Sequence, residues 1–276
     1  MSAAALTYDG TAMLGRQLLR VRNNPALVIL TQSMPITMLL FFGYFFGSAL
    51  SMPGAEYRSF LVPGLLVATA ANGIMTGMFQ AAQDVHRGVT DRLRTLPVSR
   101  AAVPLGQAAA DLVVTAAGTA PFLLVALAVG WRVEGSAAAA AGALGLLLIF
   151  RFACTWIGIH LGLLSRSEEA AGQLGSATFL LPLMSNAYIP TDGLPGRLRT
   201  LAEWNPLSAV TTALRDLFGN APVPPHSAWP VAHPVAGSLA WCALLLAVFA
   251  PLAVRRYARG EGQGLPFGSA CGGGAC

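Results

Sequence analysis

A short charged segment between two long apolar runs reads QDVHRGVTDRLRTLP over residues 83–97. On a helix, its apolar side chains recur on one narrow face and most of its charged side chains on the opposite face. The apolar face consists of Val85, Val89, Leu93 and Leu96. The charged face consists of Asp84, Arg87, Asp91 and Arg94, and the segment also carries Arg92.

This pattern predicts a short amphipathic helix over residues 84–96. Gly88 weakens its middle, and Pro97 ends it because the residue before a proline is pushed out of the helical conformation. Such a helix lies in a membrane surface with its apolar side down, leaving the charged face free for a soluble partner. The alternative is a surface loop whose charges are simply solvated.

The composition predicts an all-α polytopic membrane protein. Hydrophobic residues make up 55% of the chain and charged residues 11%, with a mean hydropathy of +0.61. A soluble domain carries about 25% charged residues, so this chain has too few to cover a water-facing surface. The net charge of +5 comes from arginines scattered between apolar runs, which does not favour a nucleic-acid patch.

Six runs are long enough to cross about 30 Å of hydrocarbon. They cover residues 27–48, 60–79, 108–129, 137–164, 170–189 and 235–254. Six spans place both termini on one side, and the positive-inside rule decides which side. Eleven arginines then face the cytoplasm, namely Arg16, Arg20, Arg22, Arg87, Arg92, Arg94, Arg100, Arg166, Arg255, Arg256 and Arg259. Five face outward, namely Arg58, Arg132, Arg197, Arg199 and Arg215, so both termini are expected in the cytoplasm.

Three further elements are expected in one membrane-spanning domain over residues 1–259 and its tail. Residues 7–24 predict an N-terminal interfacial helix, with a mobile tail as the alternative. Asn205 and Pro206 favour a helix start, and Gly219 a helix end, which predicts an external re-entrant or surface helix before the last span, with an ordinary loop helix as the alternative. The Gly-rich residues 260–276 predict a disordered cytoplasmic tail.

Two ionisable residues, Asp111 and Arg151, fall inside predicted spans, where a charge is costly. Counting from the span ends places both at similar depths, near enough for the arginine to reach the aspartate. We therefore expect a structural ion pair between the third and fourth spans. A proton relay is the alternative.

Four stretches together resemble the type-2 ABC exporter permeases, in particular the daunorubicin-resistance-type drug permeases of actinobacteria. They are YRSFLVPG at residues 57–64, the charged segment with its ending RLRTLPVSR at 92–100, SNAYIP at 185–190 leading to LPG at 194–196, and EWNPL at 203–207. Their order and spacing cover most of the chain.

The resemblance implies a six-span subunit that forms a homodimer and binds two separate ATPase subunits. The segment over residues 84–96 would couple to the ATPase, and the second and fifth spans would line the translocation path. Candidate lining residues are Asn72, Met75, Met78, Phe79, Phe179, Met184 and Asn186. Met and Phe suit a bulky lipophilic drug, antibiotic or lipid-like compound. Packing or lipid contact is the alternative for each.

The residues favour a transport subunit over an enzyme. These 276 residues contain no lysine, so they hold no phosphate-binding G-x-x-x-x-G-K-[ST] loop. We therefore expect no cofactor on this chain, and ATP and Mg on the partner ATPase. The scattered His86, His160, His226 and His233 have no metal-ligand spacing. A lipid-modifying membrane enzyme, or a passive channel or scaffold, remains the alternative function.

Overall fold

The computed structural model describes residues 15, 25–46, 54–88, 101–221 and 227–259. Three predicted segments lie outside these residues: nearly all of the N-terminal helix, the part of the charged segment after Gly88, and the Gly-rich tail. Every regular element in the described ranges is helical, which confirms the all-α prediction there.

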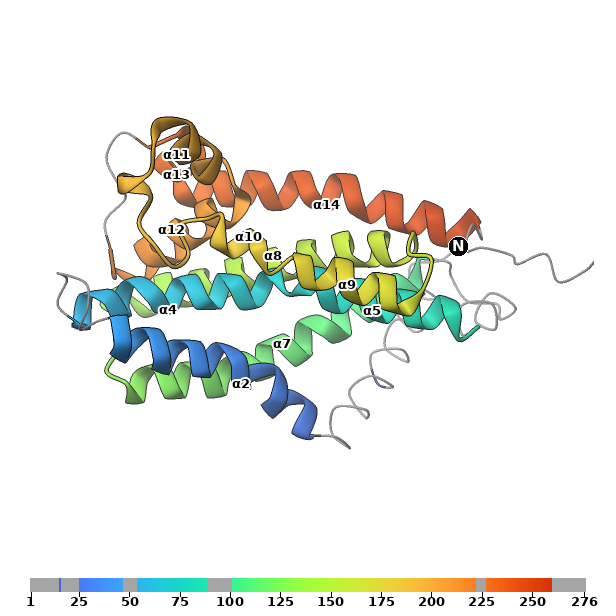
Figure 1. Ribbon diagram of the computed structural model, residues 1–276, viewed down its shortest axis with the longest axis horizontal. Helices are drawn as coiled ribbons and strands as arrows, with labels where there is room; N and C mark the ends of the chain where they lie inside the picture. Colours follow the sequence, from blue (N-terminus) through green and yellow to red (C-terminus); the bar gives the residue numbers. More distant parts are fainter. Residues whose placement is uncertain (1–14, 16–24, 47–53, 89–100, 222–226, 260–276) are drawn as a thin grey trace, which may run out of the picture.

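The helices follow one another without strands in the described part of the chain (Figure 1). Their bounds are α2 Pro25–Phe41, the π-helix η1 Phe42–Phe46, α4 Gly54–Ala71, α5 Gly73–His86, α7 Ala102–Ala128, α8 Ala137–Gly162, α9 Glu168–Ala177, α10 Leu180–Leu183, the 3-10 helix η2 Thr191–Gly193, α11 Gly196–Glu203, α12 Pro206–Phe218, α13 Trp229–Ala232 and α14 Pro234–Arg259.

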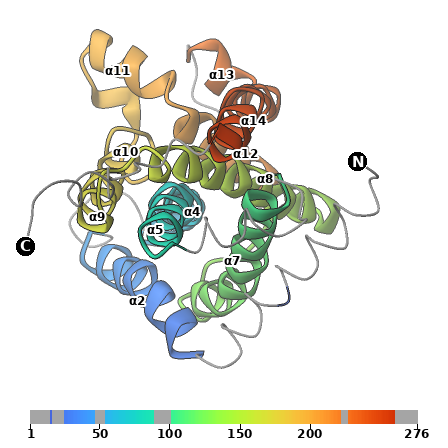
Figure 2. The same ribbon diagram turned by 90° about the vertical axis from the view of Figure 1, so that its right-hand side faces the viewer.

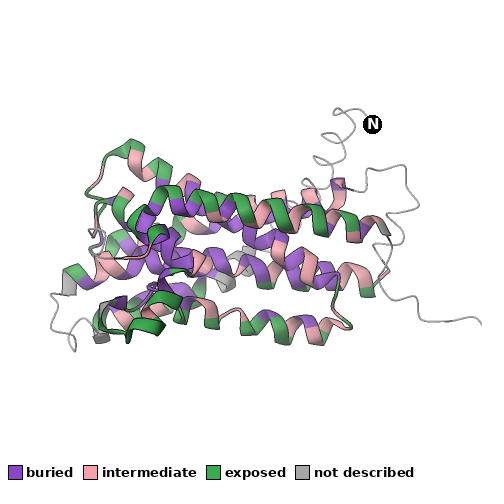
Figure 3. Ribbon diagram, turned by 90° about the horizontal axis from the view of Figure 1, so that it is seen from above, coloured by how far each residue is buried: buried purple, intermediate pink, exposed green. Residues whose placement is uncertain are grey.

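The helices α4 and α5 form one long rod with a break at Asn72, and this rod lies at the centre of the bundle. Figure 2 shows it surrounded by α2, α7, α8 and α9. The rod is also the most buried long helix, since 72% of its most apolar window is buried, against 17% for α14. Figure 3 shows the same pattern, with buried residues inside and exposed ones on the outer helices.

Four helices are long and apolar enough to cross a membrane: Glu56–His86, Ala102–Ala128, Ala137–Gly162 and Pro234–Ala258. They coincide with the second, third, fourth and sixth predicted spans. The first predicted span corresponds to α2 and η1.

The prediction of a continuous fifth span over residues 170–189 is wrong. The chain leaves the α-helix after α9 at Ala177, resumes for one turn in α10, and is non-helical from Met184 to Pro190. Pro182 lacks the amide hydrogen that a helix interior needs. The polar residues Ser185 and Asn186 instead bond to their own turn and to α12, as described below.

Glycines let α5 and α8 approach closely. A Cβ added at Gly158 would lie 2.2 Å from the Ile74 carbonyl oxygen, and one at Gly162 would lie 2.3 Å from that of Met78. Small residues at such positions allow two helix backbones to pack tightly where no water-driven hydrophobic effect holds them. The centre of the bundle is therefore fixed by backbone contact between these two helices.

Segments expected on the same side of the membrane lie at the same end of the bundle (Figure 1). We call the end that holds α11, α12 and α13 the cap end. There, the amide of Glu134, after α7, donates to the Phe218 carbonyl of α12 at 2.9 Å. At the opposite end, His86 of α5 contacts the Ser165 carbonyl after α8 at 3.3 Å. The arrangement is that of antiparallel helices joined at alternate ends.

Candidate functional site

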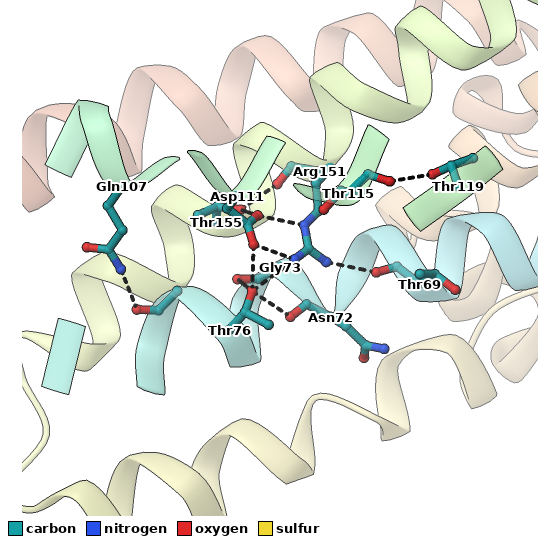
Figure 4. A network of polar contacts seen from close by, with 11 residues as sticks. Thr69, Asn72, Gly73, Thr76, Gln107, Asp111, Thr115, Thr119, Arg151 and Thr155 are labelled. Atoms are coloured by element: carbon teal, nitrogen blue, oxygen red, sulfur yellow. Dashed lines mark hydrogen bonds and ion pairs between the residues drawn. The ribbon is translucent and has the colours of Figure 1, made fainter. Parts of the chain in front are cut away.

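The bundle interior holds a bidentate ion pair between α7 and α8 (Figure 4). Arg151 donates through Nε to Asp111 Oδ2 at 2.7 Å and through Nη2 to Asp111 Oδ1 at 2.6 Å. Both side chains are almost fully buried, at 7% and 6% exposure. The hydroxyls of Thr155 and Thr76 also donate to this carboxylate, at 2.7 and 3.2 Å. The structure thus brings together the two charges that the sequence places at similar depth.

The same arginine reaches the break in the central rod. Its Nη1 donates to the Thr69 carbonyl of α4 at 2.9 Å, and its Nη2 donates to the Thr76 hydroxyl of α5 at 3.0 Å. A Cβ at Gly73 would lie 3.1 Å from Arg151 Cδ and Nε, so a glycine gives the side chain its room. One guanidinium therefore ties α4, α5 and α7 to α8 at the point where the rod is interrupted by Asn72.

A second polar junction lies at the cap end, between α12 and the non-helical stretch that replaces the end of the fifth span. The amide of Asn186 donates to Ser208 Oγ at 3.1 Å, and its side chain donates to Thr212 Oγ1 at 2.9 Å. Arg215 Nη2 donates to the carbonyls of Asn186 and Ala187 at 2.8 and 3.2 Å. Side chains of α12 thus take the place of helix hydrogen bonds in this stretch.

Arg215 also holds α4. Its Nε donates to the Phe60 carbonyl at 3.0 Å, and its guanidinium carbon lies 3.5 Å from the centre of the Phe60 ring. A Cβ at Gly64 would lie 1.8 Å from the Ala187 carbonyl oxygen, so only glycine permits this backbone contact. Burial lowers the pKa of Arg215 to about 9, which leaves the group cationic at neutral pH. The residues YRSFLVPG and SNAYIP therefore meet in space.

Glu203 links two segments at the cap end and is 4% exposed. Its Oε1 accepts from Arg199 at 2.7 Å, and its Oε2 accepts from the Ala228 amide at 2.7 Å. The following Asn205 accepts from the Leu207 amide at 3.0 Å and begins α12, which Gly219 ends with a φ of 72°. The helix expected between these two signals is present with those bounds.

At the opposite end, the expected helix over residues 84–96 is wrong in its described part. Asp84, Val85 and His86 belong to the long helix α5, and Gly88 has a φ of 67°, so one helix cannot run through it. Asp84 is half-buried between α5, α7 and α14. The other coupling candidates, Asp91, Arg92 and Arg94, lie outside the described residues.

The exposed Arg87 contacts the helix that follows α8. Its Nε lies 3.3 Å from Glu168 Oε1, at the first residue of α9. Ser167 caps α9 by accepting from the Ala170 amide at 3.1 Å. Hydrogen bonds from its own backbone amide and from the Ser167 hydroxyl lower the pKa of the neighbouring Glu169 carboxyl. The start of the fifth span is thus tied to the end of the second.

The candidate lining residues fall into two groups. Met75, Phe79 and Met184 are exposed on the described chain, at 38%, 42% and 55%. Phe179 and Asn72 are partly buried. Met78 and Asn186 are buried, at 1% and 3%, the first against α8 and the second against α12. These two therefore pack inside this subunit.

Sequence reasoning missed the polar face of α12. Ser208, Thr211, Thr212 and Arg215 recur at helical spacing and are all buried. The sequence indicates the start and the end of this helix, and the arginine count places Arg215 among the outward-facing charges. The helical spacing of these four residues is the signal in the sequence that indicates a polar face. Such a face, when it is buried, requires hydrogen-bond partners elsewhere in the fold.

These features define a polytopic integral membrane protein. Four long apolar helices carry large side chains that are exposed without a partner in the described chain, such as Leu124 at 67% and Leu244 at 52%. Polar and charged groups near the middle of these helices are buried instead, as in the Asp111 and Arg151 pair. This is the arrangement expected where lipid is the solvent.

Comparison with known proteins then gives the family. The model of the ABC-2 type transporter family matches residues 9–218. The chain is 32% identical over 258 residues to the daunorubicin resistance ABC transporter permease protein DrrB1 of Streptomyces coeruleorubidus, which covers 92% of this chain and 86% of that protein. The chain belongs to the ABC-2 type transporter family and is a membrane transport component of an ABC transporter.

Proposed function

We propose that this protein is the permease subunit of an exporter that moves a lipophilic drug, antibiotic or lipid-like compound out of the cell. The observation that carries this proposal is the similarity to the daunorubicin resistance permease along 92% of the chain. Daunorubicin is the compound in that protein's name, and a bulky lipophilic compound of this kind is the cargo that we propose here.

In this proposal a separate ATPase supplies the energy. The 276 residues contain no lysine and so hold no phosphate-binding loop of the kind that cradles ATP. Two ATPase subunits would bind a homodimer of the permease on its cytoplasmic side. The charged segment that follows α5, with Arg87, Asp91, Arg92 and Arg94, is the proposed docking element, and the half-buried Asp84 supports it from α5.

The proposed membrane topology has six crossings and cytoplasmic termini. The four long helices supply four crossings, α2 with η1 supplies the first, and α9 with α10 supplies a broken fifth. The cap end then faces outward and α12 is a re-entrant helix. Arg87, Arg166, Arg255 and Arg256 belong to segments at the other end, which is consistent with the positive-inside rule.

The proposed path lies against the exposed faces of α5 and the fifth segment, where Met75, Phe79 and Met184 are accessible. ATP-driven movement of the docking element would reach α9 through Arg87 and Glu168 and would shift the broken segment against the central rod. The opposite faces of α5 and α8 stay locked by glycine contacts.

Inside-out vesicles that contain this protein and a candidate partner ATPase test the proposal. We expect ATP-dependent uptake of daunorubicin or a related amphiphile only when both subunits are present. Purified permease alone should hydrolyse no ATP. Uptake without the ATPase, or robust hydrolysis by the permease alone, would contradict the proposal.

A further inference from the structure

Arg215 joins three segments that are far apart in the sequence. Its guanidinium donates to the Phe60 carbonyl of α4 and to the Asn186 and Ala187 carbonyls of the stretch after α10. The residue itself belongs to α12 and is 4% exposed.

The carbonyls of Asn186 and Ala187 need these donors. A helix would supply them from amides four residues further on, but the chain is not helical there. A backbone carbonyl that is buried without a donor costs about 1–3 kcal/mol. Arg215 therefore helps to stabilise the broken conformation of the fifth segment, and it links this segment to α4.

The way in which Arg215 is held differs from that of Arg151. Arg151 forms a bidentate pair with a carboxylate at 2.6 and 2.7 Å. Among the residues whose side chains the structure describes, the contacts of Arg215 are carbonyls and the ring of Phe60, with no carboxylate. These bonds are charged on the donor side only and involve no ion pair, so this guanidinium can release one segment without separating opposite charges.

The contact that Arg215 holds is tightly closed. The hypothetical Cβ at Gly64 would lie 1.8 Å from the Ala187 oxygen, so the stretch touches the backbone of α4. The second and fifth segments cannot move apart at this level while the contact persists. An exit between these two segments therefore requires the contact to open.

We propose that Arg215 is a positioning residue that holds the outer gate of the transporter closed. It keeps Asn186 and Ala187 against α4 in the resting state and releases one of the two sides when the cargo leaves. This inference rests on the proposed function, because it assigns the cap end to the exit. It adds the residue and the contact at which exit is controlled.

The test is hydrogen exchange of the segment around Asn186 in the full-length protein, reconstituted with its ATPase in lipid nanodiscs. In the wild type, we expect exchange of the Asn186 and Ala187 amides to rise about tenfold when ATP and vanadate trap the post-hydrolysis state. In Arg215→Gln, that faster exchange should already be present without nucleotide, and ATP should change it little. Arg215→Lys keeps the charge but lacks the fork and should fall between the two.

Arg197→Gln is the matched control, because it removes the same charge from an exposed position of the cap. It should exchange like the wild type in both states. A residue with only a structural role would raise exchange in both states and leave the ATP-driven difference intact, which would overturn the proposal.

The wild-type comparison needs no variant, so a folding failure of Arg215→Gln leaves the test intact. If hydrolysis is coupled to uptake but wild-type exchange at Asn186 stays constant, the gate is wrong and the proposed function stands. If no ATPase binds or no hydrolysis occurs, the proposed function fails and the gate fails with it. The nucleotide-free variants then report only the static contact.

Discussion

Replacing either member of the buried Asp111 and Arg151 pair leaves the other charge without its partner inside the bundle. Breaking a buried pair in this way costs about 3–5 kcal/mol. The four donors around Asp111 set the scale here, since two come from Arg151 and two from the hydroxyls of Thr76 and Thr155. We expect Asp111→Asn and Arg151→Gln each to lower stability by about 3 kcal/mol or more.

The double variant removes both charges and keeps groups that can bond to the threonines. We expect it to lie closer to the wild type than either single variant does, so the interaction energy exceeds about 3 kcal/mol. Each single variant should lower the midpoint of thermal unfolding by about 6 to 12 °C. Tryptophan fluorescence of the protein in detergent micelles measures these midpoints.

Glu134→Gln is the control, because it removes one carboxylate from an exposed position and should change stability by less than about 0.5 kcal/mol. Additive losses in the double variant, or single variants with the midpoint of the wild type, would refute the reasoning. Either result would mean that the two charges do not depend on each other in the membrane.

Two other predictions concern the packing and the inner end of the bundle. Gly158→Ala should destabilise the protein by more than about 1 kcal/mol, because its Cβ would lie 2.2 Å from the Ile74 carbonyl oxygen. Gly142→Ala on the same helix is the control. A Cβ there has nothing within 4 Å, so this variant should be neutral or stabilising by about 0.5–1 kcal/mol. Equal midpoints for the two would contradict the close contact of α5 and α8. Arg87→Glu should reduce uptake without lowering stability by more than about 1 kcal/mol, since the pair with Glu168 is exposed. Adding Glu168→Arg in the same chain should restore part of the uptake. Uptake that stays reduced in the charge-swapped variant would show that Arg87 acts through another partner.

Local signals in the sequence were sufficient for several elements. Asn205 with Pro206, and Gly219, predicted the bounds of α12 because capping depends on residues within one turn. The depths of Asp111 and Arg151 could be counted along their spans because a helix rises by a fixed amount per residue. The lengths of the apolar runs predicted the four long helices, because the same rise per residue converts a run of residues into a membrane-crossing distance.

Tertiary contacts decided the features that the sequence did not reveal. The fifth span has the composition of a continuous helix, and its break is stable only because α12 supplies donors to Asn186 and Ala187. Counting arginines on each side of the membrane places Arg215 among the outward charges, because such a count says nothing about burial. The end of α5 depends on Gly88, whose left-handed conformation no pattern of charges indicates.

In the proposed mechanism, the charged segment after α5 receives its force from a partner ATPase. A photoreactive residue placed at Asp91 or Arg92 tests this contact, with one at Arg197 of the cap end as the control. We expect ultraviolet light to join the ATPase to the chain from positions 91 and 92 in membranes that contain both subunits, and not from position 197. Cross-links from position 197 alone, or none from any position while ATP-driven uptake persists, would contradict the account.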